Sequence, residues 1–299
     1  MKEYPYQYID YQVDRKAKIA TVTLSNPKRR NVAPVFAEDQ LIDAIDEWER
    51  DDDVKVVIIK GAGDDFCAGH DVGEYNKVFG VGRESRHNLR DPLIAEREVR
   101  VALRRILFSM KPTIAQVHGL CIEFGNALQV CTDITIAANN AHFGNLGQAA
   151  GISGITIIRI YMHLIGQKRM REMMVSGRTW SGREASRIGL INRSVPQEKL
   201  EAEALNEARR IALLPLDGIV AGKAYTHQIY ESMGFGLAFT ENAYFHTLGL
   251  KLKFDPDEVA FFREVKNKGF KTAVLERAER YKPMGGFGPD DERPIVLEQ

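Results

Sequence analysis

The chain has 299 residues, of which 44% are hydrophobic, and its 41 basic residues balance its 41 acidic residues. This length can bury one substantial core, and the balanced charge excludes a global field that would recruit nucleic acid or an anionic membrane. Three cysteines without paired ligand spacing (Cys67, Cys121 and Cys131) are typical of a reducing compartment, so we expect a cytoplasmic protein without a metal site. Neither a signal peptide nor a membrane-spanning run is predicted.

Strands and helices are predicted to alternate in the N-terminal part of the chain. The alternating β-branched residues of Ile19 to Leu24 predict a strand that ends at the turn Asn26-Pro27. Helical spacing over Phe36 to Trp48, followed by an apolar run from Val54 to Ile59, predicts a strand, helix and strand crossover. The basic cluster Lys28-Arg29-Arg30 is either solvated or a phosphate clamp.

The apolar run leads through a glycine-containing turn into Phe66-Cys67-Ala68-Gly69-His70-Asp71. A buried strand that ends in such a turn exposes backbone N–H groups, which form an anion site without a charged side chain. The polar stretch Asp71 to Asp91 is interpreted either as a mobile lid or as a solvated insertion. Apolar positions among charges over Leu93 to Met110 predict an amphipathic helix, which Lys111-Pro112 ends.

A second donor site is predicted after the strand Thr113 to Val117. This strand leads to Gly119 and then to an apolar helix, Phe124 to Cys131. The N-terminus of that helix directs N–H groups without intrahelical acceptors towards whatever lies beside Glu123-Phe124-Gly125. Asp133 to Ala138 predicts a further strand.

The remainder of the chain is predicted to be mainly helical. One helix extends from Leu200 to Leu214 and is ended by Pro215. The aromatic and aliphatic stripe from Phe235 to Leu250 is expected to form an oligomer core. Asp255 to Gly269 predicts another helix. The charged segment Glu276 to Gln299 is expected to be an extended arm or disordered.

Several motifs, in their order and spacing, resemble the crotonase, or enoyl-CoA hydratase/isomerase, superfamily. They are Phe66 to Asp71, Val117-His118-Gly119 with Cys131 to Ile134, Ala141 to Gly144, Gly166 to Arg169, Ser181 to Ala185, Gly189 to Ile191 and Val195-Pro196. This combination is more specific than any single glycine motif. Ser181-Gly182-Arg183-Glu184 is also the pattern of a capping box, so that part of the match has a structural cause.

The resemblance implies an α/β fold. A crotonase-like spiral of repeated ββα units would occupy residues 1–198, and a C-terminal helical oligomerisation region with an extended tail would occupy residues 199–299. It also implies an acyl-CoA thioester as the small-molecule substrate, no cofactor besides the coenzyme A of that substrate, and a homotrimer or a dimer of trimers. The backbone N–H groups of His70 and Phe124 would hold the thioester oxygen as an enolate develops. His70 is shared with the methylmalonyl-CoA decarboxylase branch, which carries the same Ala-Gly-His-Asp sequence.

The chain departs from the hydratase branch at both of its glutamate positions, which align with Ala127 and Gly147. Besides His70 and Phe124, we assign catalysis to Glu123 and Asn145, with helix capping as an equal alternative for Glu123. Substrate binding is assigned to Arg29, Ala68, Asp71, Gly125, Asn126 and Gln148. Asn126, Asn145 and Gln148 either orient water or a substrate carbonyl, or satisfy buried backbone groups. His118 is expected to be a satisfied core or surface group.

The expected function is therefore that of an acyl-CoA-processing lyase of enoyl-CoA hydratase/isomerase type. Hydration requires a positioned base and acid, each usually worth on the order of 10² to 10⁴ in rate, and both family glutamates are missing. The alternatives are a C–C bond lyase or hydrolase, meaning a decarboxylase or a retro-Claisen β-diketone hydrolase, and a non-catalytic scaffold with a crotonase fold.

Overall fold

The computed structural model describes residues 7–34, 36–71, 73–74, 100–147, 156–249, 254–255, 257–258 and 260–284, with residues 90, 93–94 and 286. Their strands form two sheets, one of six strands and one of three. The larger sheet has the order β1 (Ile9–Asp14), β2 (Ile19–Leu24), β3 (Val56–Gly61), β4 (Thr113–Val117), β6 (Ile134–Ala138) and β9 (Arg193–Val195). The smaller sheet has the order β5 (Leu120–Ile122), β7 (His142–Gly144) and β8 (Trp180–Ser181).

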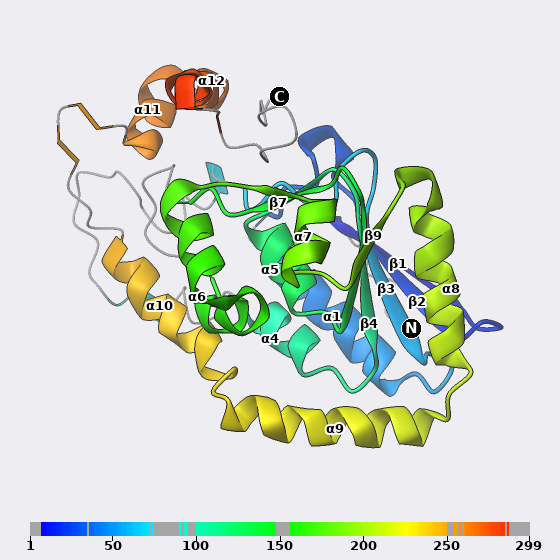
Figure 1. Ribbon diagram of the computed structural model, residues 1–299. Helices are drawn as coiled ribbons and strands as arrows, with labels where there is room; N and C mark the ends of the chain where they lie inside the picture. Colours follow the sequence, from blue (N-terminus) through cyan, green and yellow to red (C-terminus); the bar gives the residue numbers. More distant parts are fainter. Residues whose placement is uncertain are drawn as a thin grey trace.

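The larger sheet is parallel apart from the antiparallel pair β1 and β2. Its central strands β3 and β4 are buried on both faces, as is typical of parallel strands with helices on each side. Figure 1 shows α8 (Leu200–Ala212) on one face and α1 (Ala37–Arg50), α4 (Val101–Leu107) and α5 (Phe124–Val130) on the other. The predicted α/β class is therefore confirmed, and each crossover places the next parallel strand beside the preceding one.

The strands predicted at Ile19 to Leu24 and at Thr113 to Val117 are confirmed at both ends. The predicted single helix from Leu93 to Met110 is wrong, because Arg100 has a left-handed backbone (φ 85°) and α4 begins after it. The N–H of Arg100 donates to the buried Glu38 carboxylate of α1 at 2.5 Å, which fixes the chain direction there. Most of the stretch Asp71 to Asp91 lies outside the described residues.

The C-terminal half contributes six further helices to the described structure: α6 (Ile158–Ser176), α7 (Gly182–Ile188), α9 (Leu216–Ser232), α10 (Leu237–Gly249), α11 (Phe261–Lys268) and α12 (Phe270–Tyr281). The predicted capping box is confirmed at the start of α7, where Ser181 and Glu184 exchange hydrogen bonds. The expectation of an extended arm from Glu276 is wrong as far as Tyr281, because α12 continues to that residue. Figure 1 shows α11 and α12 at the opposite end of the molecule from α9.

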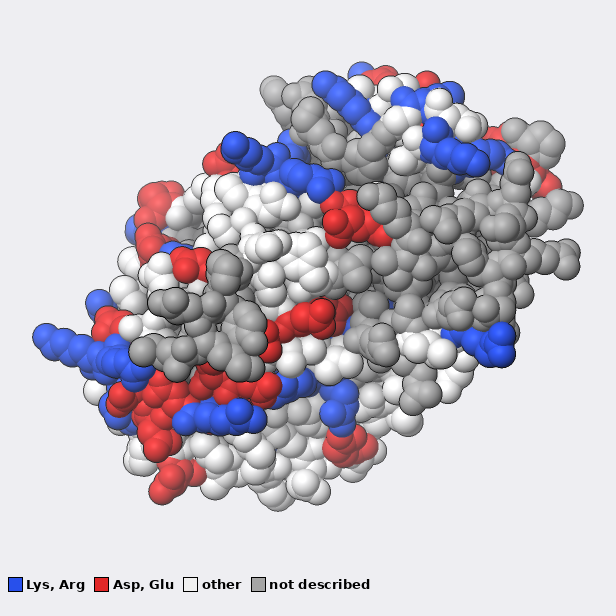
Figure 2. Space-filling view, turned by 180° about the vertical axis from the view of Figure 1, so that it is seen from behind, with Lys and Arg blue, Asp and Glu red and all other residues white. Residues whose placement is uncertain are grey.

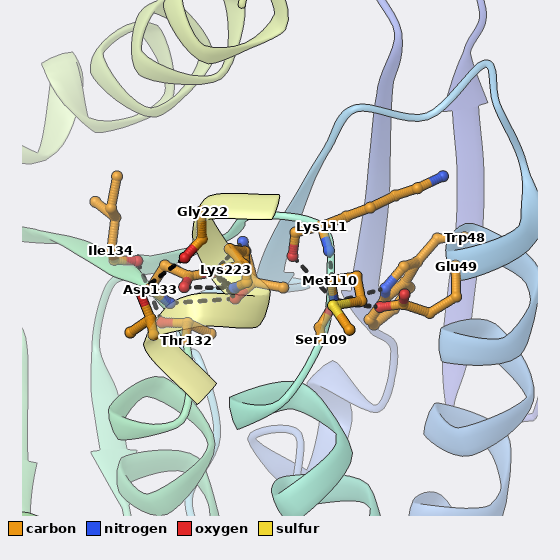
Figure 3. Close-up of polar contacts among 12 residues, drawn as sticks. Trp48, Glu49, Ser109, Met110, Lys111, Thr132, Asp133, Ile134, Gly222 and Lys223 are labelled. Carbon is orange, nitrogen blue, oxygen red and sulfur yellow. Dashed lines mark hydrogen bonds and ion pairs between the residues drawn. The ribbon is translucent and has the colours of Figure 1, made fainter. Parts of the chain in front are cut away.

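Helix α9 is attached to the sheet by the Lys223 ammonium group, which donates to the Asp133 carboxylate just before β6 (Figure 3). The same carboxylate accepts the Thr113 N–H at the start of β4 at 2.8 Å. Figure 3 also shows Ser109 between the Glu49 carboxylate and the Trp48 indole, which joins the end of α4 to α1. These contacts hold the chain at the end of the sheet opposite to the ends of β3 and β4 that lead to the predicted donor sites.

Helix α8 follows the predicted boundary at residue 198 but covers the same sheet as the N-terminal helices do. At its C-terminal end the carbonyls of Ala212 and Leu214 accept hydrogen bonds from the Lys55 ammonium group beside β3. In the predicted oligomer stripe, Phe235 and Phe239 are buried within this chain, whereas Leu237 and Tyr244 are more than half exposed. The oligomeric role of the stripe stays a prediction.

Both acidic and basic side chains occur on the face seen in Figure 2, where acidic side chains gather at the lower left with basic ones beside them. Among the described residues, no helix is both long enough and apolar enough to cross a bilayer.

Candidate active site

The two predicted donor segments lie side by side. Cys67 pairs with Cys121 in parallel, since its N–H donates to Leu120 O at 2.8 Å and its carbonyl accepts from Ile122 N at 2.9 Å. Three residues further along each segment, this register brings His70 opposite Phe124. Their rings are 4.8 Å apart between centroids. The structure thus brings together His70 and Phe124, which the sequence analysis had assigned to donor sites after two separate strands.

The backbone directs the His70 N–H towards the segment that contains Phe124. On the other side of His70, Ala33 N donates to Gly69 O and Asp71 N donates to Ala33 O, both at 2.8 Å. In a parallel bridge of this kind, the N–H of the residue between those two bonds points away from the partner strand. Phe124 is the first residue of α5, so its N–H has no acceptor within the helix. The His70 amide therefore points away from Ala33, and the Phe124 amide is left without an acceptor in its helix.

Two glycines permit this close approach. A Cβ atom at Gly125 would lie 2.6 Å from Cys67 O and 2.7 Å from Cys67 Cβ, so any larger residue would push α5 away from the first segment. Gly69 has φ 107°, and a Cβ there would lie 3.1 Å from the Cβ of Glu123. The Glu123 side chain therefore packs directly against the residue that precedes His70.

Glu123 joins β5 to α5 through an unusual backbone conformation, with φ 52° and ψ −110°. Its N–H donates to Gly144 O at 3.1 Å, and its carboxylate is hydrogen-bonded by the backbone of Leu146 and Gly147 and by the Asn145 side chain. A non-glycine residue in a sparsely populated backbone region costs about 1–3 kcal/mol, and such residues cluster at functional sites. The strain and the buried carboxylate coincide at one residue beside the donor pair.

The Glu123 side chain does not cap α5, so the capping alternative is wrong. Its carboxylate turns instead towards the turn formed by residues 145–147, where Asn145 Oδ1 also accepts from Gly147 N at 3.1 Å. Burial raises the pKa of Glu123 to about 7, against the hydrogen bonds of this turn and the positive charge of Arg277, which lower it. A carboxylate with a pKa near neutrality can both accept and return a proton at physiological pH.

Three of the predicted substrate-binding residues, Arg29, Asp71 and Ala68, lie in or close to the first donor segment. Arg29 forms an ion pair with the Asp71 carboxylate, which also accepts from Gly73 N at 3.0 Å and Glu74 N at 3.3 Å. Burial opposes ionisation of Asp71, but these hydrogen bonds and the Arg29 charge hold its pKa below the ordinary range. Ala68 packs beside Leu120 and its neighbours in a small apolar cluster.

Two further predicted residues make structural contacts. Asn126 is fully buried, donates to Gly144 O at 3.2 Å and accepts from Gln129 Nε2 at 2.9 Å, so its amide joins α5 to β7. His118 Nε2 hydrogen-bonds with Gly63 O at 2.8 Å, which confirms the expectation of a satisfied group. Gln148 lies outside the described residues.

Sequence reasoning missed two residues beside Glu123. Arg277 of α12 is 6% exposed, and its charge interacts with Glu123, although it belongs to the segment predicted to be an extended tail. The spacing of Val274, Arg277 and Tyr281 along one helical face is the signal that would have identified it. Tyr161 of α6 is 1% exposed, and its hydroxyl has no hydrogen-bond partner among the described residues. Burial raises its pKa, as do the nearby charges of Cys121, Cys131 and Glu123.

Among the described residues, the arrangement brings the backbone amides of His70 and Phe124 near the buried carboxylate of Glu123. Donors aimed at developing negative charge stabilise an oxyanion, each being worth about 2.7–4 kcal/mol. The residue that carries the carboxylate directly precedes the residue of the second donor. Within the described part of the chain, no group of three or more His, Cys, Asp or Glu side chains could hold a metal ion.

The comparisons with known proteins agree with this geometry. The family model described as enoyl-CoA hydratase/isomerase matches residues 14–270. A Mycobacterium tuberculosis protein named "Putative enoyl-CoA hydratase EchA13" is 30% identical over 254 residues, which cover 78% of this chain and 77% of that protein. The crystal structure of an enoyl-CoA hydratase/isomerase from Xanthobacter autotrophicus Py2 superposes with a TM-score of 0.78 at 26% identity, over 92% of this chain and 98% of the other. An enoyl-CoA hydratase from Mycobacterium smegmatis has the same fold, with a TM-score of 0.82 at 20% identity over 98% of each chain.

Proposed function

The chain belongs to the enoyl-CoA hydratase/isomerase family, and from that premise we propose that it is an enzyme that converts acyl-CoA thioesters through an enolate. The observation that carries the proposal is the juxtaposition of His70 and Phe124 at the ends of two paired segments. In the proposed mechanism their N–H groups hold the thioester oxygen as negative charge develops on it. Coenzyme A enters as part of the substrate, and no other cofactor is proposed.

Glu123 is the proposed proton-transfer residue. It accepts a proton from the carbon next to the thioester carbonyl, and the electron pair of the broken C–H bond moves onto the carbonyl oxygen. Return of that proton to another carbon of the conjugated system completes an isomerisation. In a hydration, Glu123 instead takes a proton from water as the water oxygen bonds to the β-carbon. The electron pair of the C=C bond moves onto the carbonyl oxygen, and return of the proton from Glu123 to the α-carbon completes the reaction. Asn145 is proposed to hold the carboxylate in position through its hydrogen bond to Glu123.

A second candidate reaction is cleavage of a C–C bond, either by decarboxylation or by retro-Claisen hydrolysis. It is favoured by the absence of acidic side chains at Ala127, which is buried, and at Gly147, whose backbone belongs to the turn that holds Glu123. In a decarboxylation the bond to the carboxylate breaks, its electron pair forms the same enolate, and the enolate is then protonated. This route needs the oxyanion site but no second catalytic acid.

A substrate panel separates these reactions. The wild-type protein, Glu123→Gln and Asn145→Ala would be assayed with enoyl-CoA, malonyl-type CoA and β-diketone substrates. We expect Glu123→Gln to lower kcat on the order of 10²- to 10⁴-fold, because it removes the proton carrier. It should retain affinity for a saturated acyl-CoA, which cannot react. Unchanged turnover would remove Glu123 from the mechanism, and binding of an acyl-CoA without any turnover would favour the scaffold alternative.

We also propose that the chain assembles as a homotrimer or a dimer of trimers. The exposed apolar side chains of α9 and α10, among them Tyr225, Ile229 and Tyr244, support an interface between subunits. Light scattering coupled to size-exclusion chromatography measures the mass directly. A monomer at micromolar concentration would contradict the assembly but leave the proposed chemistry intact.

A further inference from the structure

We propose that Arg277 is a positioning residue that holds the Glu123 carboxylate in its ionised, proton-accepting form within the buried site. The inference deepens the proposed function, on which it rests for the chemical use of Glu123. It assigns a role to α12, which lies at the end of the molecule opposite α9 (Figure 1).

Helix α12 is packed onto the wall of the candidate site. Its Ala273 and Val274 are buried. One turn beyond Arg277, Tyr281 packs against the apolar cluster of Leu120, Ile122 and Leu146. Leu120 and Ile122 belong to the strand that leads to Glu123, and Leu146 belongs to the turn that binds its carboxylate. The packing therefore fixes the height and rotation of the helix face that carries Arg277.

The guanidinium group is itself held in place from a second helix. It lies 4.6 Å from the centroid of the Phe261 ring of α11, in cation–π geometry. Arg277 is 6% exposed, so water screens its charge far less than that of a surface arginine. A planar, permanently charged group fixed by an aromatic ring suits a residue that orients a carboxylate.

The groups around Glu123 act in opposite directions. The amides of residues 145–147 and Arg277 from α12 favour the anion, whereas burial opposes it. Tyr161 from α6 also interacts with Glu123, whose charge helps to raise the pKa of the Tyr161 hydroxyl, so that hydroxyl is neutral at physiological pH. Arg277 in turn faces Glu123 and Tyr281; burial lowers its pKa, and both of these neighbours raise it. Without a cation, a carboxylate buried to this degree would keep its proton at neutral pH and could not act as a base.

The experiment measures ionisation of Glu123 directly, without substrate. Protein labelled with ¹³C at the glutamate side-chain carboxyl carbon would be titrated by NMR, and the Glu123 signal would be assigned by its loss in Glu123→Gln. We expect Arg277→Met to raise the midpoint of that signal by about 1 to 3 pH units, which is the usual effect of removing a nearby opposite charge. Arg277→Lys keeps the positive charge and should restore most of the wild-type midpoint.

Arg280→Met is the matched control, because Arg280 lies on the same helix but is exposed and donates only to Asp257 O, among the contacts described, at 3.1 Å. It should leave the midpoint unchanged. The direction in which the Glu123 midpoint moves also distinguishes loss of the Arg277 charge from exposure of Glu123 to water. If Arg277→Met merely loosened α12, water would reach Glu123 and the midpoint would fall towards the ordinary value. A lowered or unchanged midpoint in Arg277→Met overturns the inference.

The proposed function is tested separately by turnover. In an active enzyme, Arg277→Met should move the rising limb of kcat/KM against pH to higher pH, with KM for the acyl-CoA changed less than twofold. If no CoA ester is bound or turned over while the NMR midpoint still rises, the proposed function fails and the role of Arg277 stands. If turnover is found but the midpoint does not rise, the proposed function stands and the role of Arg277 fails.

Discussion

Gly125→Ala tests whether the close approach of the two segments creates the oxyanion site. A Cβ atom at this position would lie 2.6 Å from Cys67 O, whereas ordinary contact begins at 3.4 Å. The first turn of α5 must therefore move by the difference, about 0.8 Å, or the Phe66-Cys67 segment must move by the same distance. Either movement separates the Phe124 N–H from the His70 N–H.

The expected losses follow from that displacement. Overpacking of a well-packed core costs about 1–3 kcal/mol, so the variant should unfold at a lower temperature but still fold. A misplacement of about 1 Å at the reacting groups costs on the order of 10²-fold in rate. We expect kcat to fall by that factor while the binding of a saturated acyl-CoA changes little, because the donors act most strongly on the developing oxyanion.

Gly222→Ala is the matched control for this substitution. It makes the same chemical change inside α9, where an added Cβ would meet no atom within 4 Å. Because alanine is the better helix former by about 1 kcal/mol, this variant should be slightly more stable and fully active. The assays are thermal unfolding and turnover of the substrate identified by the panel. If Gly125→Ala matched Gly222→Ala in both, the contact with Cys67 would not control the site.

Three other predictions concern ionisation and folding. Wild-type kcat/KM should rise with pH through about 7, the pKa of Glu123, and Glu123→Gln should lose this limb. Burial also raises the pKa of Glu38 to about 7, so both carboxyls bind protons more tightly in the folded state, and stability should fall as the pH rises from about 4.5 to about 7. Each carboxyl should contribute on the order of 3 kcal/mol to that fall in the free energy of unfolding. Chemical denaturation of Glu38→Gln at several pH values should show a smaller fall. A pH dependence equal to that of the wild type would contradict the raised pKa of Glu38. Ser181→Ala should cost about 1 kcal/mol by removing the cap of α7, and Ser181→Thr should restore most of it if the cap is responsible.

The sequence predicted the parts of the fold that depend on local signals. Alternation of β-branched residues located β2, and an apolar run between breakers located β4. The helix expected from Phe124 begins there, directly after the non-helical backbone of Glu123. The motif resemblance placed His70 and Phe124 in one site, and the register of Cys67 with Cys121 supplies the physical reason.

The errors arose where distant contacts decide the structure. The break at Arg100 depends on the carboxylate of Glu38, which is 62 residues away in sequence. Helix α12 is charged overall, so its composition resembles a solvated tail, although Val274 and Arg277 share a buried face. No local pattern indicates that the Asn126 amide would be used by Gly144 O, because that partner lies on another strand.

The position of Glu123 in the chain limits which substrate atoms its carboxylate can reach. The residue precedes the second donor directly, so the covalent backbone limits how far the Glu123 carboxylate can lie from the Phe124 N–H, and the hydrogen bonds of residues 145–147 hold the carboxylate in place. In the proposed mechanism, a thioester oxygen bound at that N–H would place its α-carbon within reach of this carboxylate. Isomerisation, hydration and decarboxylation all pass through this enolate and use the same two elements. They differ in the bond that is made or broken next to it, and we infer that the walls around the acyl group, rather than the oxyanion site, decide which reaction the enzyme performs.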